Sequence, residues 1–89
     1  MKIDTVTVYC LREKLENSFA FSQGRVNERT STIVKISTTN GLVGWGECFN
    51  QGLEPPEISA YIIFSVFKNI IIGKDPRNVE HIWFEMYHF

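Results

Sequence analysis

The stretch NGLVGWGE, residues Asn40–Glu47, decides how the middle of this 89-residue sequence folds. Its first two residues, Asn40-Gly41, are the strongest short signal for a β-hairpin, because both tolerate the positive φ that a type I′ turn requires. A glycine-rich loop that binds phosphate would instead lie between a strand and the N-terminus of a helix. The glycines here lie in the turn and in the strand that returns from it, so we predict a hairpin rather than a phosphate site.

The residues around this turn predict a three-stranded antiparallel meander. Residues 2–11 (KIDTVTVYCL) and 30–38 (TSTIVKIST) are rich in β-branched side chains, and residues 42–49 (LVGWGECF) form the return strand. Alternation places Val6, Val8 and Cys10 on one face of the first strand. The opposite face receives Ile3, Thr5, Thr7, Tyr9 and Leu11.

The two faces of the return strand carry different side chains. Gly44 and Gly46 share one face, and glycine within a strand often marks the close approach of another backbone, so we expect tight packing there. The other face carries Val43, Trp45, Glu47 and Phe49. An antiparallel sheet in a small domain usually leaves one face to water, so this apolar second face predicts a cover of further protein.

Two helices are predicted after the sheet. Pro55-Pro56 ends the preceding loop, and residues 57–72 have the length of a helix with apolar residues around most of its circumference, which is typical of a helix buried on several sides. Gly73 is expected to end this helix, and Asp75-Pro76 is expected to supply the N-cap and first-turn proline of the next. The second helix carries an apolar stripe of Val79, Ile82, Trp83, Met86 and Tyr87.

Residues 12–29 (REKLENSFAFSQGRVNER), between the first two strands, allow two interpretations. Aromatic residues beside polar hydrogen-bonding groups suit a lid over a ligand, as in a loop that carries function. The same residues also suit a partly ordered extension of the hairpin in which the phenylalanines simply pack down.

Composition argues against several functions. The net charge is −1, with nine basic and ten acidic residues and no basic block, which argues against a nucleic-acid partner. The longest mostly apolar run, residues 58–67, is too short to span a membrane, and the N-terminus lacks the apolar core of a signal peptide. Cys10 and Cys48 are not spaced as a metal pair, and without a secretion signal they predict reduced thiols in the cytoplasm.

The residues themselves name no reaction. No nucleophile–base pair and no paired carboxylates at catalytic spacing stand out, and we expect Glu47 to be a structural hydrogen-bonding partner. His81 and His88 are seven residues apart, whereas two metal ligands on one helix are normally three or four apart. Physical reasoning alone therefore predicts a small α+β domain with uncovered apolar surface.

The order of the motifs resembles a known family. The sequence begins with MKI and V.VY.L, continues with T.IVKI.T.NGLVGWGE, and ends with an apolar helix and IIGKDPRNVEHIW. This order is similar to the N-terminal capping domain of the mandelate racemase and muconate lactonizing enzyme family, in the enolase superfamily. The resemblance covers essentially the whole chain, so we predict one domain, residues 1–89, with an enolase N-terminal domain-like α+β fold. The fold is incomplete, because the family normally continues into another helix and a barrel.

The resemblance implies that this chain is one part of an enzyme. In complete family members a barrel holds Mg²⁺ on three carboxylates, and a base in that barrel abstracts a proton α to the substrate carboxylate. The capping domain places two loops over the barrel mouth, where they exclude water and shape specificity. The implied partners are the catalytic barrel, a small molecule that bears a carboxylate, and further copies of the same protein.

The resemblance also carries two groups of loop residues onto this sequence. In the first loop, around residues 19–27, we expect Phe19, Phe21, Ser22, Gln23 and Arg25 to face substrate. In the second, around residues 48–54, the candidates are Phe49, Asn50 and Gln51. The polar members favour an acid-sugar dehydratase, since a hydroxylated substrate needs hydrogen-bond partners, while the two phenylalanines favour a less polar acid. A racemase and a lactonizing enzyme stay open.

The departures from the family pattern predict that the chain is inactive alone. It contains neither the carboxylate triad nor the base arrangement of the barrel, so we expect no catalytic residue, no metal site and no cofactor of its own. We expect a fragment of a cytoplasmic enzyme. The alternative is a non-catalytic module that self-associates or binds a partner through its aromatic sheet face.

Overall fold

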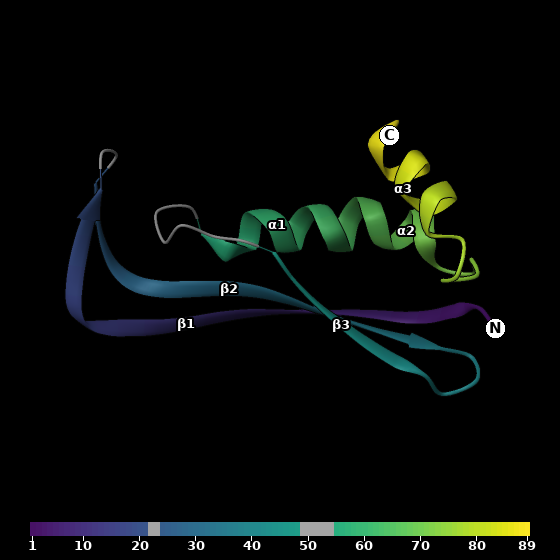
Figure 1. The fold of residues 1–89 in the computed structure, drawn as a ribbon, viewed down its shortest axis with the longest axis horizontal. Helices are drawn as coiled ribbons and strands as arrows, with labels where there is room; N and C mark the ends of the chain where they lie inside the picture. Colours follow the sequence, from purple (N-terminus) through teal and green to yellow (C-terminus); the bar gives the residue numbers. More distant parts are fainter. Residues whose placement is uncertain (22–23, 49–54) are drawn as a thin grey trace.

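The computed structural model describes residues 1–21, 24–48 and 55–89, with side chains described outside residues 14–28. Three strands, β1 (Ile3–Phe21), β2 (Gly24–Thr38) and β3 (Val43–Cys48), form an antiparallel sheet in the order β1-β2-β3 (Figure 1). The predicted α+β class and meander topology are confirmed.

The helices follow the sheet and lie on one side of it (Figure 1). A continuous helical rod consists of α1 (Pro56–Ile62), the π-helical turn η1 (Ile63–Phe67) and α2 (Lys68–Ile71). Gly73, with a φ of +84°, follows the rod as predicted, and α3 (Val79–Tyr87) comes after it. None of the helices in the described ranges has the length and apolarity needed to cross a membrane.

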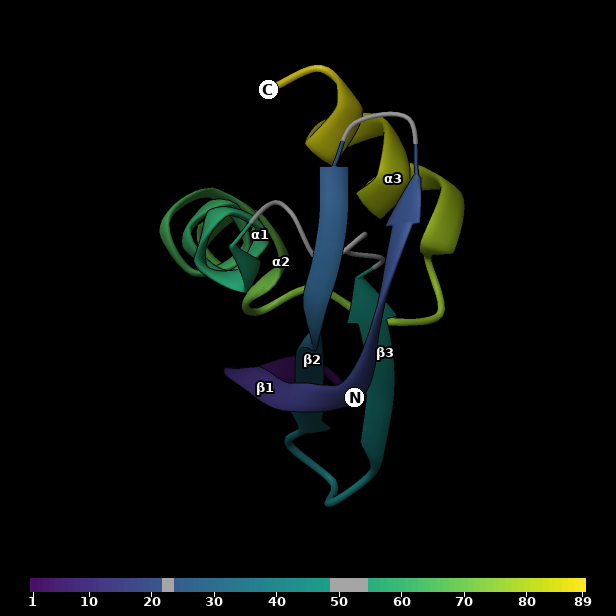
Figure 2. The same ribbon diagram turned by 90° about the vertical axis from the view of Figure 1, so that its left-hand side faces the viewer.

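The core is small and lies between the sheet and the helices. Its buried members are Ile3 and Val6 of β1, Ile71 of α2 and Ile82 of α3. Partly buried side chains of β2 and the helices pack against them: Val34, Ile36, Ile63, Ile70 and Met86. In Figure 2 the helical rod and α3 are both seen beside the sheet, so one core connects all three.

The predicted alternation along β1 is wrong at Ile3. A register shift separates the pair Ile3↔Thr38 from the pair Thr5↔Ser37, so Ile3 joins Val6 in the core instead of facing away from it. The Ile3 amide donates to the Lys74 carbonyl at 2.8 Å, and the Gly73 amide donates to the Ile3 carbonyl at 2.8 Å. These bonds to the α2–α3 connection hold the start of β1 in place.

The hairpin at Asn40-Gly41 is confirmed, but its predicted turn type is wrong. Among the described residues only glycines have positive φ, and Gly41 has a φ of +88° while Asn40 does not. The Gly41 amide donates to the Thr38 carbonyl at 3.0 Å, and the Thr38 amide donates to the Leu42 carbonyl at 2.9 Å. This is a three-residue hairpin loop that needs positive φ only at its last residue.

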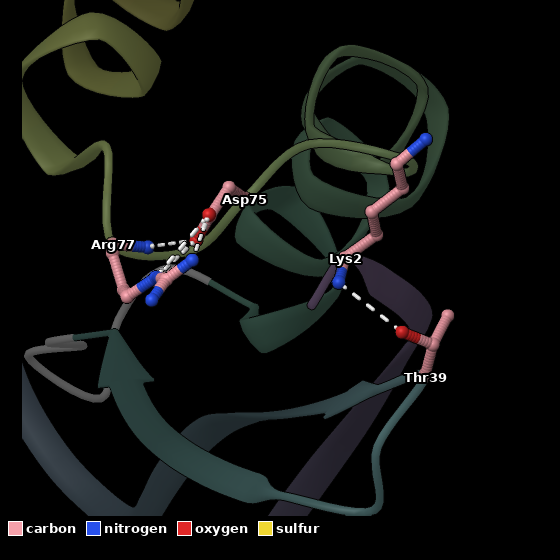
Figure 3. A network of polar contacts seen from close by, with 4 residues as sticks. All are labelled: Lys2, Thr39, Asp75 and Arg77. Atoms are coloured by element: carbon pink, nitrogen blue, oxygen red, sulfur yellow. Dashed lines mark hydrogen bonds and ion pairs between the residues drawn. The ribbon is translucent and has the colours of Figure 1, made fainter.

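The connection before α3 also differs from the prediction, because Asp75-Pro76 does not begin the helix. The Asp75 carboxylate accepts hydrogen bonds from the Arg77 amide at 2.9 Å and from its guanidinium at 2.7 Å (Figure 3). The Asp75 side chain thereby closes a turn on the residue two positions ahead, and α3 starts only at Val79. The hydrogen bonds from Arg77 lower the pKa of Asp75 to about 2.

The tight packing expected at Gly44 and Gly46 is absent among the described residues. A Cβ atom built on either glycine would meet no atom of the described residues within 4 Å. This part of β3 is therefore open on the side where the helices lie.

Candidate functional site

The first two strands continue well past the end of the third. β3 ends at the pair Thr32↔Cys48, whereas β1 and β2 stay paired as far as Phe21↔Gly24. Residues 12–30 thus form a two-stranded projection, which we call the hairpin arm, and Figure 1 shows it turning toward the helix side of the sheet. The described backbone of this segment extends the hairpin, while the side chains of its phenylalanines lie outside the described residues, so its role as a lid over a ligand stays a prediction.

The hairpin arm carries three of the predicted capping residues at its tip. Phe19 pairs with Val26, and Arg25 pairs with Ala20. Phe21, the last residue of β1, pairs with Gly24. Ser22, Gln23, Phe49, Asn50 and Gln51 lie outside the described residues. The contact of these eight residues with a substrate stays a prediction.

An ion pair joins the base of the hairpin arm to the start of α1. The Arg12 guanidinium donates to both carboxylate oxygens of Glu57, at 2.6 and 2.5 Å, in the bidentate geometry that favours arginine. The hydrogen bond from Arg12 lowers the pKa of Glu57. The sequence patterns did not link Arg12 with Glu57, because the two residues are 45 positions apart in the chain.

Thr32 connects the end of β3 with the start of α1, the two described elements between which the second predicted capping segment lies in the sequence. Its side chain is fully buried (0% exposed), and its Oγ1 donates to the Pro56 carbonyl at 2.9 Å. On the sheet side, Thr32 pairs with Cys48, the last residue of β3. One residue of β2 therefore positions the end of β3 and the beginning of α1. No local sequence pattern predicted this role of Thr32.

A second buried threonine lies two positions before it. Thr30 is only 7% exposed, and its Oγ1 has no hydrogen-bond partner among the described residues. The backbone pairs place Thr30 opposite Arg12 and Thr32 opposite Cys10, so these four residues belong to the base of the hairpin arm. The base of the arm thus combines the surface ion pair of Arg12 and Glu57 with two buried threonines. The Thr32 hydroxyl is hydrogen-bonded, and the Thr30 hydroxyl has no partner among the described residues.

The two cysteines are not joined in a disulfide, and they lie on the strands on either side of Thr32. Cys10 and Cys48 are two strand spacings apart, roughly 10 Å between Cα atoms. A disulfide needs Cα atoms closer than about 7 Å, so these thiols do not form one in this fold. The expected reduced state agrees with this geometry.

The outer face of the sheet, opposite the helices, carries exposed aromatic groups. Trp45 is 63% exposed and stacks on Tyr9 with ring centroids 6.2 Å apart. Lys35 Nζ lies over the Trp45 ring, 5.5 Å from its centroid. Glu47 accepts a hydrogen bond from the Ser31 hydroxyl, as expected of a structural partner. Among the described residues, none covers the Trp45 side chain on this outer face of the sheet closely enough to bury it.

The described residues do not fit a magnesium site. His81 Nε2 lies 2.6 Å from Glu85 Oε1, and Glu85 also pairs with Lys74, whose hydrogen bond lowers the Glu85 pKa. His88 Nδ1 lies 2.9 Å from the Phe84 carbonyl oxygen. Within residues 1–21, 24–48 and 55–89, no three His, Cys, Asp or Glu residues are grouped to hold a metal ion.

The Arg12–Glu57 pair predicts a specific pH dependence. Because its folded-state pKa lies below the ordinary value of 4.5, Glu57 stabilises the fold above that pH, and this contribution disappears as the pH falls through the lowered pKa. We expect Glu57→Gln to lower the melting temperature slightly at neutral pH and not at all in strong acid. Thermal melts of the unchanged chain and of Glu57→Gln, from neutral pH down to strong acid, measure the difference in melting temperature. A difference that persisted at low pH would contradict the assignment.

The meander, the long hairpin arm and the one-sided helices together define an N-terminal domain of the enolase-superfamily type. The chain belongs to the family described as Mandelate racemase / muconate lactonizing enzyme, N-terminal domain, which matches residues 3–89. This confirms the resemblance found in the sequence motifs.

Individual relatives of this chain are enzymes that are several times longer than it is. It is 34% identical over 88 residues to D-galactarolactone cycloisomerase of Agrobacterium fabrum and 32% identical over 89 residues to N-succinyl-L-Arg/Lys racemase of Bacillus cereus. These matches cover 99% and 92% of this chain but only 22% and 23% of the relatives. The crystal structure of dipeptide epimerase from Enterococcus faecalis, complexed with Mg and the dipeptide L-Leu-L-Tyr, superposes with a TM-score of 0.82 at 33% identity, over 100% of this chain and 26% of that one. The chain thus spans about a quarter of the length of these relatives.

Proposed function

We propose that this chain is the substrate-capping domain of a magnesium-dependent enolase-superfamily enzyme that abstracts a proton α to a carboxylate. The observation that carries the proposal is the family match over residues 3–89, combined with relatives in which such a domain is only 22–26% of the chain. The relatives are a cycloisomerase, a racemase and an epimerase. The domain has no activity alone.

The cap acts by closing over substrate held in a separate catalytic barrel. The tip of the hairpin arm contributes Phe19, Phe21, Ser22, Gln23 and Arg25, and the segment after β3 contributes Phe49, Asn50 and Gln51. Closure of such segments removes water from the reacting groups and strengthens electrostatic interactions there. Arg12–Glu57 and Thr32–Pro56 support this role, because they tie the base of the arm and the start of α1 into one unit.

The metal and the catalytic bases belong to the barrel partner. The described residues of this chain offer no group of metal ligands, so the chain contributes binding and exclusion of water and takes no part in proton abstraction. The complete enzyme is a cytoplasmic homo-oligomer.

The substrate is an acid sugar or a related hydroxylated carboxylate. Polar groups at the arm tip favour a substrate with hydroxyl groups, because a buried hydroxyl needs a hydrogen-bond partner. The name of the Agrobacterium relative, D-galactarolactone cycloisomerase, points to the same chemical class. The racemase and epimerase relatives make amino-acid and dipeptide substrates the main competitors.

The test is to continue the reading frame of the gene past the codon for Phe89 and to compare the longer protein with the 89-residue chain. Both are incubated in D₂O with Mg²⁺ and acid sugars, N-succinyl amino acids or dipeptides, and exchange of the α proton is followed by NMR. We expect exchange by the longer protein alone, only with Mg²⁺, and fastest with an acid sugar.

Exchange catalysed by the 89-residue chain itself would overturn the proposal. A stop codon directly after Phe89 would also overturn it, and would favour the alternative, a self-associating module that uses the exposed Tyr9–Trp45 face.

A further inference from the structure

β3 is an edge strand of the sheet along its whole length. The strand order β1-β2-β3 places β2 on one side of it, and no described strand lies on the other side. It pairs with β2 from Ser37↔Val43 to Thr32↔Cys48 without a register shift, and it makes no comparable contact with any described helix. Val43 is 51% exposed, and Trp45 is more exposed still. β3 is therefore a regular strand with one side open to pairing.

Three residues of β3 direct their backbone groups toward this open edge: Val43, Trp45 and Glu47. The Thr38 amide donates to the Leu42 carbonyl at 2.9 Å, which fixes the phase of the hydrogen bonds between β2 and β3. Because bonded and non-bonded pairs alternate in an antiparallel ladder, Gly44 and Gly46 bond to β2. The N–H and C=O groups of the three other residues then face away from β2, and no backbone bond from another described residue reaches them.

Among the described residues, β3 lacks the devices by which proteins block an edge strand. Such devices include proline, an edge lysine and a bulge, and β3 contains none of the three. Its one charged side chain, Glu47, accepts a hydrogen bond from Ser31 of β2, which directs the carboxylate over the sheet and away from the edge. The opposite edge is protected at its start, because Ile3 of β1 bonds to Gly73 and Lys74.

We infer that the β3 edge pairs with the β3 edge of a second copy of this chain, antiparallel and about a two-fold axis at Trp45, to give one continuous sheet across both copies. Of the registers that two-fold symmetry allows, this one pairs all three outward-facing residues. Val43 then lies opposite the partner's Glu47, and Trp45 lies opposite the partner's Trp45. Each of these pairs exchanges two backbone hydrogen bonds.

The side chains of β3 suit this two-fold pairing. On the helix side, Gly44 lies opposite the partner's Gly46 in a non-bonded pair, where Cα atoms approach to about 4.5 Å and no side chain intervenes. On the outer face, the Tyr9–Trp45 stack continues into the stack of the second copy. Aromatic side chains on directly opposite residues stabilise antiparallel pairs. This match of glycine with glycine and of tryptophan with tryptophan favours a second copy over an unrelated strand.

The contact closes at two copies. An isologous contact uses the same β3 edge on both subunits, and the protected start of β1 opposes growth from the other edge. One short strand from each copy buries less surface than the roughly 1,200–2,000 Å² of a stable interface, so we expect a weak dimer whose population depends on concentration. The inference builds on the homo-oligomer of the proposed function, to which it assigns a contact surface.

Proline at position 43 tests the edge pairing. The Val43 amide faces away from β2, so Val43→Pro removes a donor from the edge without removing a hydrogen bond to β2. Val43→Thr is the matched control, because it keeps both the amide and a β-branched side chain. Sedimentation over a range of concentrations is expected to show a dimer for the unchanged chain and for Val43→Thr, and a monomer for Val43→Pro. Equal melting temperatures of the two variants in dilute solution establish that the fold is kept.

The position of the two-fold axis gives a second, independent measurement. Across the axis, the two Cα atoms of position 45 lie about 5.5 Å apart, within the range of a disulfide. We expect Trp45→Cys to form a covalent dimer under mild oxidation, with peptide mapping that assigns the bond to position 45 and not to Cys10 or Cys48. Thr7→Cys is the control, because it is exposed on the same face but lies on β1, and we expect it to stay monomeric.

Three results would overturn the inference. The first is a monomeric mass of the unchanged chain up to about 1 mM, the Kd of a very weak complex. The second is a dimer that Val43→Pro leaves intact, which would assign self-association to another surface. The third is equal cross-linking of Trp45→Cys and Thr7→Cys. All three are measured without Mg²⁺ or substrate, so they are separate from a failure of the proposed enzymatic function.

Discussion

Replacing Ile71 by alanine is expected to lower the free energy of unfolding by about 2–5 kcal/mol, the cost typical of removing a large aliphatic side chain from a core. Ile71 is 7% exposed and is one of four buried apolar residues that join the helical rod to the sheet. Domains typically have only about 5–15 kcal/mol of stability, and a chain this short buries less surface than most. The variant is therefore expected to be partly unfolded at 37 °C.

Ile58→Ala is the matched control for Ile71→Ala. Ile58 lies in the same helical rod but is 54% exposed, so its truncation leaves little cavity, and alanine has the higher helix propensity. Urea denaturation followed by circular dichroism measures both variants. Equal losses of unfolding free energy in Ile71→Ala and Ile58→Ala would contradict the assignment of the core to the sheet side of the rod.

Exchanging threonine for valine is expected to have opposite effects at two neighbouring buried positions. Thr32→Val removes the hydrogen bond to the Pro56 carbonyl and leaves that buried oxygen without this donor, which costs about 1–3 kcal/mol. Thr30→Val replaces a buried hydroxyl that has no partner in the described part of the chain, so we expect no loss and a gain of up to about 1 kcal/mol.

The two variants control for each other, because they make the same chemical change two residues apart on one face of β2. Chemical denaturation of both proteins at the same pH measures the difference. Equal destabilisation would mean that shape alone matters at these sites, and would remove the argument that Thr32 anchors the start of α1. The activities of Thr32→Val and Thr30→Val can also be compared in the longer protein. A loss of activity in Thr32→Val alone would be attributed to the anchoring of the cap and not to general stability.

Short-range patterns were enough for much of the fold. The strands around Asn40-Gly41, the apolar rod and its end at Gly73 all follow from side chains near one another in sequence, and the structure confirms each of them. The order of the same motifs also predicted the family. These features depend on local backbone preferences and on periodic burial, which a sequence displays directly.

The tertiary structure decided the features that depend on distant partners. Ile3 enters the core because a register shift and the α2–α3 connection place it there, against the simple alternation of the strand. Residues 12–30 form an arm because two strands pair along its length, and the base of that arm is set by Arg12 with Glu57 and by Thr32 with Pro56.

The features of the candidate site also divide into those that the sequence determined and those that only the tertiary structure decided. The sequence by itself determined which family the chain belongs to and which loop residues are candidates for contact with substrate. Only the tertiary structure showed what anchors those loops and that Gly44 and Gly46 face an open groove. The physical reason is that a hairpin or a helix is encoded by neighbours in the chain, whereas an ion pair across 45 residues, a buried hydrogen bond between strand and helix, and an uncovered strand exist only once the layers have packed.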